Sequence, residues 1–198
     1  MKPTHGSRSG FTVLEMMLSV GVFAVVGYGV AVAVKSGGTM QSTVVRVSNE
    51  GREMRGASLS LLDELQTSSD AHISALTQSD ASTLLRFQQP VEDAGGLTWG
   101  VYDPAIGSTE ADHNRVGWFL RYLVRTHSGV RQLVRQELDA AQAVQRESVV
   151  VEGLRSGHDS PPGFRVRKTG SIWEVTLSTD GVHGEEGIRT VFHVKTRN

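Results

Sequence analysis

The chain has 198 residues, of which 38% are hydrophobic and 21% charged, and its formal net charge is −1. This composition is close to the globular average, so it excludes a wholly disordered, collagen-like or low-complexity chain, and the small net charge gives no global reason to expect a nucleic-acid binder. The sequence contains no cysteine, which excludes disulfides, thiol catalysis and cysteine-ligated metal sites. The length fits one domain, or a smaller domain with a membrane element.

The first predicted element is a long apolar segment near the N-terminus. Residues 11–34 contain a single charged residue, Glu15. As a helix they would be about 36 Å long, which meets the requirement of roughly 20 apolar residues for crossing a membrane. Lys2 and Arg8 precede the segment, and positive charge there favours keeping that end in the cytoplasm. Three interpretations are open at this point: a cleaved secretory signal, a plain signal anchor, and a leader that is cut before the apolar segment.

Glu15 helps to choose among these three interpretations. A carboxylate inside an apolar segment makes membrane insertion less favourable, and an ordinary signal or anchor gains nothing from it. An acid in this position is therefore a functional hypothesis that requires a partner. The alternative is that Glu15 lies at the membrane interface and is merely tolerated there.

The residues around Glu15 resemble the class III signal of type IV prepilins and type II secretion pseudopilins. In that signal a short basic leader ends in glycine, and Phe-Thr-x-x-Glu opens an apolar helix; here Gly10, Phe11, Thr12 and Glu15 occupy those positions. The resemblance implies that a prepilin peptidase cuts between Gly10 and Phe11 and methylates the new amino group of Phe11. It also implies that Glu15 pairs with the Phe11 amine of an adjacent subunit, which suits the requirement that a buried charge be paired.

The resemblance extends to the layout of the chain and implies an α+β, pilin-like fold. We expect a cleaved leader at 1–10, a membrane-spanning and assembly half of one long helix at 11–35, an amphipathic half at 36–68, and a globular antiparallel β head at 69–198. Residues 35–39 contain two glycines that could break the helix, but a weak point within one helix fits the pilin-like layout better. The amphipathic half is predicted to pack against the head through residues at helical spacing, namely Val44, Val47, Met54, Leu61, Leu62 and Leu65.

From about residue 82 the pattern changes to short strands separated by turn residues. We interpret 103–115 as a loop because it contains Pro104, Gly107 and Asn114. Two hairpins are expected, with turns at 127–129 and 169–170. The predicted strands are 84–88, 97–102, 116–125, 130–138, 149–154, 164–168, 172–177 and 188–195.

Five arginines and no acidic residue lie between positions 115 and 135. On a hairpin they could form a basic strip for DNA phosphates, surface polysaccharide or an acidic partner subunit. The alternative is the charged, solvated face of an ordinary sheet. The candidate partner-binding residues are Arg115, Arg121, Arg125, Arg131 and Arg135.

The sequence contains no P-loop, dinucleotide-binding, nucleophile-elbow or zinc-protease motif, so we expect a structural protein rather than an enzyme, with no metal site and no cofactor. The resemblance implies a minor pilin that initiates or caps assembly of a type IV pilus, or alternatively a J-type minor pseudopilin of a type II secretion system. The implied partners are a prepilin peptidase, other pilin or pseudopilin subunits and an inner-membrane assembly platform. The implied location is the bacterial inner membrane, with a single pass and a periplasmic C-terminal head, and then the filament near its tip. A secreted or anchored binding domain with an ordinary signal is the alternative of another class.

Overall fold

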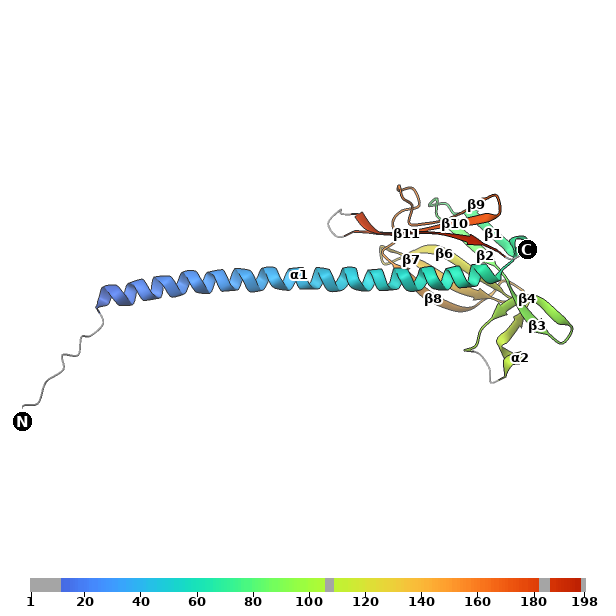
Figure 1. Cartoon of the computed structure of the whole chain (residues 1–198), viewed down its shortest axis with the longest axis horizontal. Coiled ribbons are helices and arrows are strands. Elements are labelled where there is room, and N and C mark those ends of the chain that lie inside the picture. The colour runs from blue at the N-terminus through green and yellow to red at the C-terminus, as the bar shows by residue number, and fades with distance from the viewer. Residues whose placement is uncertain (1–11, 106–108, 182–185, 197–198) are drawn as a thin grey trace, which may run out of the picture. The chain divides into compact units, whose positions relative to one another are not determined.

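The computed structural model describes residues 12–105, 109–181 and 186–196, and its chain divides into two compact units, Met1–Val47 and Ser48–Asn198. The expected leader and the residue that follows it, Phe11, lie outside the described residues. Figure 1 shows the order of the elements along the chain. The two units are described separately below.

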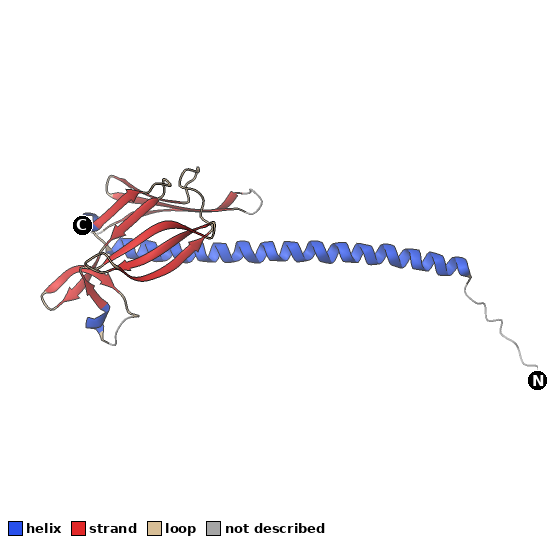
Figure 2. Cartoon of the chain, turned by 180° about the vertical axis from the view of Figure 1, so that it is seen from behind, coloured by secondary structure: helices blue, strands red, loops and turns tan. Residues whose placement is uncertain are grey.

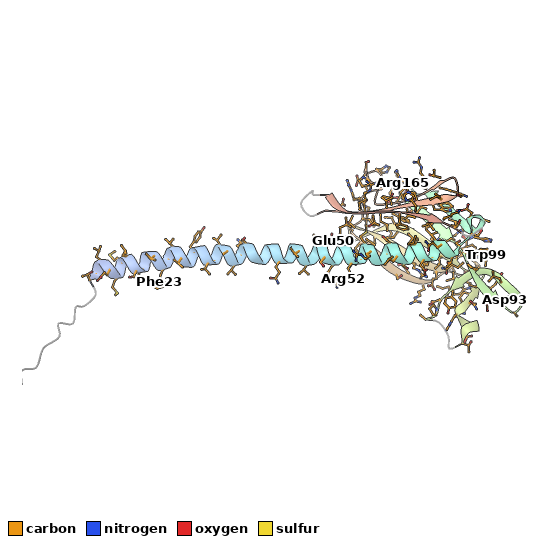
Figure 3. All side chains as sticks on the ribbon, in the orientation of Figure 1. Phe23, Glu50, Arg52, Asp93, Trp99 and Arg165 are labelled. Atoms are coloured by element: carbon orange, nitrogen blue, oxygen red, sulfur yellow. The ribbon has the colours of Figure 1, made fainter. Side chains whose placement is uncertain are left out.

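One helix, α1 (Val13–Thr67), begins in the first unit and ends in the second (Figure 2). Residues 35–39 are helical, so the two glycines there do not end the helix, as predicted. The part Val13–Ser36 is long and apolar enough to cross a membrane, judged by length and composition, and none of it is buried. Figure 3 shows the side chain of Phe23 projecting outward from this part, and 78% of it is exposed.

In the second unit, α1 turns one side toward the protein core. Met54, Leu61 and Leu65 are at most 1% exposed, and Leu62 is partly buried against the same core. The prediction that the apolar stripe would be buried from its start was wrong, because Val44 and Val47 are exposed. Helical spacing identifies the side of a helix that is apolar, but burial also requires a neighbouring element at that level.

The described strands of the head are antiparallel, as predicted, and form three sheets. A five-stranded sheet has the order β1-β2-β6-β7-β8, and two three-stranded sheets have the orders β11-β10-β9 and β3-β4-β5. A 3-10 turn, η1 (Asp70–His72), follows α1, and a short helix, α2 (Glu110–His113), precedes β5. The strands are β1 (Ile73–Thr77), β2 (Thr83–Phe87), β3 (Gln89–Asp93), β4 (Gly96–Tyr102), β5 (Asn114–Val116), β6 (Phe119–His127), β7 (Val130–Leu138), β8 (Val144–Glu152), β9 (Phe164–Thr169), β10 (Ile172–Asp180) and β11 (Glu186–Lys195).

Several predicted strands are present, and β7 has the predicted bounds. The prediction missed β1 and β3, and it placed a loop where α2 and β5 lie. β3 contains Pro90 and polar residues, and only Val91 in it is buried, so its sequence has no clear alternation. β8 begins five residues earlier than predicted. The prediction missed its first half because that half is exposed and carries polar and charged residues.

Among the described residues, one apolar core joins α1 to the five-stranded sheet and to the β9–β11 sheet. It includes Leu61 of α1, Tyr122 of the five-stranded sheet and Val175 of the β9–β11 sheet, each of them 0% exposed. Burying a large apolar side chain completely contributes about 1.5–3 kcal/mol, so this core is the main stabilising element of the head. The described chain therefore has an α+β layout, with an apolar N-terminal helix and antiparallel sheets.

Asp70 ties the end of α1 to the β9–β11 sheet. Its carboxylate accepts hydrogen bonds from Trp173 Nε1 at 2.6 Å and Thr196 Oγ1 at 3.1 Å, and lies 2.7 Å from Lys168 Nζ. The contacts with Lys168 and then Trp173 hold the pKa of Asp70 below its ordinary value. The carboxylate is therefore bound in its charged form.

Candidate functional site

Glu15 lies in the first turn of α1, where it forms a capping box with Thr12. The backbone N–H and the Oγ1 hydroxyl of Thr12 donate to Oε2 of Glu15 at 3.0 and 3.1 Å, and the backbone N–H of Glu15 donates to Thr12 Oγ1 at 3.3 Å. Reciprocal bonds of this kind satisfy backbone donors that the first turn of a helix leaves open. Glu15 therefore has a local structural role that its sequence motif did not reveal to us.

The capping box leaves part of the Glu15 carboxylate accessible. Both bonds from Thr12 end on Oε2, while Oε1 accepts no hydrogen bond from the described part of the chain, and the residue is exposed. A cation can therefore approach Oε1 without disrupting the cap. The predicted partner, the amine of Phe11 in another subunit, remains a prediction, as does cleavage after Gly10.

The five arginines of the predicted basic strip do not lie on one face. In the β6–β7 register, Arg121 is opposite Gln136 and Tyr122 is opposite Arg135. Successive side chains of a strand point to opposite faces, so Arg121 and Arg125 lie on one face of the sheet, and Arg131 and Arg135 on the other.

The fifth arginine, Arg115, belongs to β5 in another sheet, and its guanidinium lies 5.5 Å from the ring centre of Trp118. The prediction that the five arginines form one basic strip was therefore wrong.

Acidic residues from outside the 115–135 window neutralise much of this charge. Arg125 pairs with Glu147 on β8, and Arg131 lies 3.7 Å from the Asp180 carboxylate on β10. On the face of the sheet that carries Arg121 and Arg125, Arg86 of β2 lies directly opposite Arg121, so two cations are neighbours there. Burial and the charge of Arg86 together lower the pKa of Arg121. Partner binding by Arg121 and Arg125 stays a prediction.

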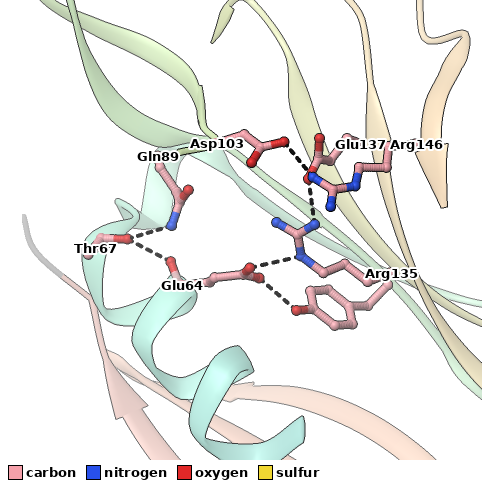
Figure 4. Close-up of polar contacts among 8 residues, drawn as sticks. Glu64, Thr67, Gln89, Asp103, Arg135, Glu137 and Arg146 are labelled. Carbon is pink, nitrogen blue, oxygen red and sulfur yellow. Dashed lines mark hydrogen bonds and ion pairs between the residues drawn. The ribbon is translucent and has the colours of Figure 1, made fainter. Parts of the chain in front are cut away.

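Arg135 lies at the centre of a partly buried polar cluster between α1 and the sheet (Figure 4). Its Nε donates to Glu64 Oε1 at 2.8 Å, and its Nη1 donates to Glu137 Oε1 at 2.6 Å. The Tyr122 hydroxyl donates to Glu64 Oε2 at 2.7 Å. These contacts link α1, β6 and β7 in the part of the head where the helix ends.

Burial is the dominant influence on the pKa values of Glu64 and Tyr122 in this cluster. It raises the pKa of Glu64 above its ordinary value, although the charge of Arg135 and the bonds from Tyr122 and Arg135 act in the opposite direction. Burial likewise raises the pKa of Tyr122 well above its ordinary value. Tyr122 is therefore a neutral donor to Glu64.

A second ion pair lies beside the first. Arg146 of β8 donates from Nη1 to Asp103 Oδ2 at 2.7 Å, and Asp103 directly follows β4. Burial alone would raise the pKa of Asp103, but hydrogen bonds from Ala105 N and from Arg146 outweigh it and hold the pKa below its ordinary value. The side chain of Asp103 is 6% exposed and that of Arg146 is 50% exposed.

A cavity of about 610 Å³ opens between these two ion pairs. The acidic residues that line it are Asp63, Glu64, Asp103 and Glu137, and the basic residues are Arg135 and Arg146. Within the described ranges, no three His, Asp or Glu side chains are grouped so as to hold a metal ion. We call this space the acidic cavity.

Sequence reasoning missed the acidic residues of this cavity, although two signals for the cluster exist. Glu64 follows Leu61 by three residues, so both lie on the side of the helix that faces the core. Arg135 is two residues from Leu133, so both point to the same face of β7. Glu137 is two residues beyond Arg135, so it carries the same signal, whereas Asp103 follows β4 in another sheet and carries none.

Comparisons of this chain with protein families, with curated proteins and with solved structures found no match. The sequence motif at the N-terminus and the geometry described above are therefore the basis for assigning a function to this chain.

Proposed function

We propose that this chain is a structural subunit of a type IV pilus-like filament, a minor pilin that is processed by a prepilin peptidase and helps to initiate or cap assembly. The observation that carries the proposal is the combination of Gly10, Phe11, Thr12 and Glu15 directly before an apolar helix. A J-type minor pseudopilin of a type II secretion system fits the same combination, since the two machines use the same signal and the same kind of subunit.

The properties of the apolar helix support this proposal. Its first 24 residues, Val13–Ser36, are unburied and apolar, so they require a lipid phase or the apolar surfaces of other helices. In the proposed pathway the bilayer supplies the first environment and neighbouring subunits in the filament supply the second. The head then lies on the periplasmic side, because the basic leader stays in the cytoplasm.

Glu15 has two compatible roles in this pathway. Through Oε2 it caps the first turn of α1, and through Oε1 it can receive the methylated amine of Phe11 from a neighbouring subunit. Pairing these charges allows both to leave water during assembly, since an isolated buried charge is strongly unfavourable.

Processing at Gly10 tests the proposal directly. The full-length chain, carrying a C-terminal tag, is expressed with and without a prepilin peptidase, and the mature N-terminus is determined by mass spectrometry. We expect N-methylated Phe11 as the first residue only when the peptidase is present. Gly10→Val should block cleavage because the site needs a small residue, so the full-length precursor should accumulate in the membrane.

Gly6→Val is the matched control, because it makes the same change in the leader but away from the cleavage site. Normal maturation of Gly10→Val would contradict the class III interpretation. A mature chain that begins near Val34 would indicate an ordinary secretory signal, and an intact start would indicate a plain anchor. Either outcome would replace the filament proposal with a secreted or anchored binding domain.

A further inference from the structure

The acidic cavity holds more negative than positive charge among its buried groups. Three carboxylates are well buried, with side-chain exposures of 13% for Glu64, 6% for Asp103 and 1% for Glu137. Two guanidinium groups, those of Arg135 and Arg146, face these three acids. Within this group of five residues, one carboxylate is therefore in excess.

The excess is located at Glu137. Its Oε1 accepts from Arg135, but its Oε2 is buried and accepts no hydrogen bond from any described residue. The carboxyl groups of Glu137 and Asp103 line the same cavity, each bound by its own arginine (Figure 4). A buried carboxylate in excess of the neighbouring cations must hold a proton or bind a cation, because an unpaired charge is strongly unfavourable in a poorly solvated site.

We propose that the acidic cavity binds an organic cation, an ammonium or guanidinium group, through Glu137 Oε2 and the adjacent Asp103 carboxylate. Its volume of about 610 Å³ is large enough for an aminoalkyl or guanidinoalkyl chain. These groups present several N–H donors over a wide arc, so they suit acids that are not grouped closely enough to coordinate a metal ion.

The geometry also indicates from which side the cation enters the cavity. Arg146 is half exposed and held by Asp103, whereas Glu137 lies at the buried end. A slender cationic chain that enters past Arg146 would therefore bring its charge to Glu137 and leave its carbon atoms along the cavity wall. The source of the cation is either a free small amine or a Lys or Arg side chain of another protein.

Binding is tested on the full-length chain in detergent micelles by NMR titration with n-butylammonium chloride. We expect saturable shifts of the backbone amides near Asp103, Glu137 and Arg146, and no such shifts with n-butanol, which has a similar shape but no charge. Glu137→Gln keeps the shape of the side chain and removes its charge, so it should weaken binding by about tenfold or more. Glu92→Gln is the matched control, because Glu92 is exposed on β3 and does not line the cavity.

A second variant tests the site without changing Glu137, in case Glu137→Gln impairs folding. Ser148 is exposed on β8 and lines the cavity, so Ser148→Trp should block entry sterically without changing any charge, whereas Ser148→Ala should bind normally. Butylammonium binding that survives both Glu137→Gln and Ser148→Trp would overturn the proposal. Absence of butylammonium binding, or binding of Ca²⁺ in its place, would overturn it as well.

Crosslinking in cells distinguishes between the two possible sources of the cation. A photoreactive amino acid at Ser148 should capture one partner protein, and replacing a Lys or Arg in the crosslinked peptide by Gln should abolish capture if that side chain is the ligand. Capture that persists after such replacements, together with butylammonium binding in vitro, would assign the site to a free amine.

Discussion

The capping role of Glu15 and its proposed counter-ion role predict different outcomes for variants that can be compared side by side. Glu15→Gln keeps an oxygen that accepts the two bonds from Thr12, but it removes the negative charge. Glu15→Ala removes both the acceptor and the charge. Thr12→Ala removes the hydroxyl that closes the capping box and leaves the charge of Glu15 intact.

The expected sizes of these effects are far apart. Loss of a helix cap such as Thr12 costs about 0.5–2 kcal/mol, which corresponds to a change of about 2- to 30-fold and is confined to the first turn of α1. Removing one partner of a buried ion pair changes an equilibrium by about a hundredfold or more, because the other charge is left without a counter-ion. Both Glu15 variants should therefore be strongly depleted from filaments, and Thr12→Ala only mildly.

The assay compares the amount of each variant in sheared filaments, or crosslinked to neighbouring subunits, with the amount of mature protein in membranes. Processing after Gly10 should be unaffected, since none of the three variants changes the small residue at the cleavage site. Wild-type incorporation of Glu15→Gln, with Thr12→Ala as depleted as Glu15→Ala, would show that capping is the role of Glu15. Wild-type incorporation of all three would refute the counter-ion role.

Three further predictions concern the head. The fragment Ser48–Asn198 should fold as a soluble monomer and elute as one in size-exclusion chromatography, because it contains the whole apolar core. An insoluble or aggregated fragment would show that its helix requires another subunit. Leu61→Ala should cost about 2–5 kcal/mol in urea unfolding, because Leu61 is 0% exposed, whereas Leu59→Ala, at 59% exposure on the same helix, should cost less than about 0.5. The pKa of Asp70 in the folded protein is below its ordinary value of 3.8, so the contribution of Asp70 to folding stability is present above that pH and is lost as the pH falls through the lower folded pKa. Asp70→Asn should therefore flatten the Tm–pH curve below about pH 4, and an unchanged acid slope would contradict this.

Local sequence signals predicted α1 well. The apolar segment and the helical spacing through Leu61 and Leu65 extend over many turns, and a pattern this long outweighs the local effect of the glycines at 37 and 38. The same spacing could not distinguish Val47 from Met54, because the two side chains look alike in the pattern, although Met54 is buried and Val47 is exposed.

Strands were predicted where alternation was strong, as in β7, and missed where burial was partial. β1 has no fully buried residue, and β3 has one, so neither has the two-residue period that sequence reasoning depends on. These strands are fixed by pairing with β2 and β4, whose own patterns are clearer.

The sequence by itself contains the Gly10, Phe11, Thr12 and Glu15 motif, and it determined the apolar helix and the mixed helix-and-strand character of this protein, because each of these depends on residues close together in the chain. The charges of the head were decided by tertiary structure alone. Arg135 reads in sequence as one of five solvent-facing arginines, yet pairing of β6 with β7 turns it toward Glu64, 71 residues away. Asp103, which follows β4, and Glu137, on β7 of another sheet, line the same cavity, so a basic stretch of sequence borders an acidic cavity. Contact between charges distant in sequence depends on strand order and register, and a local pattern specifies neither.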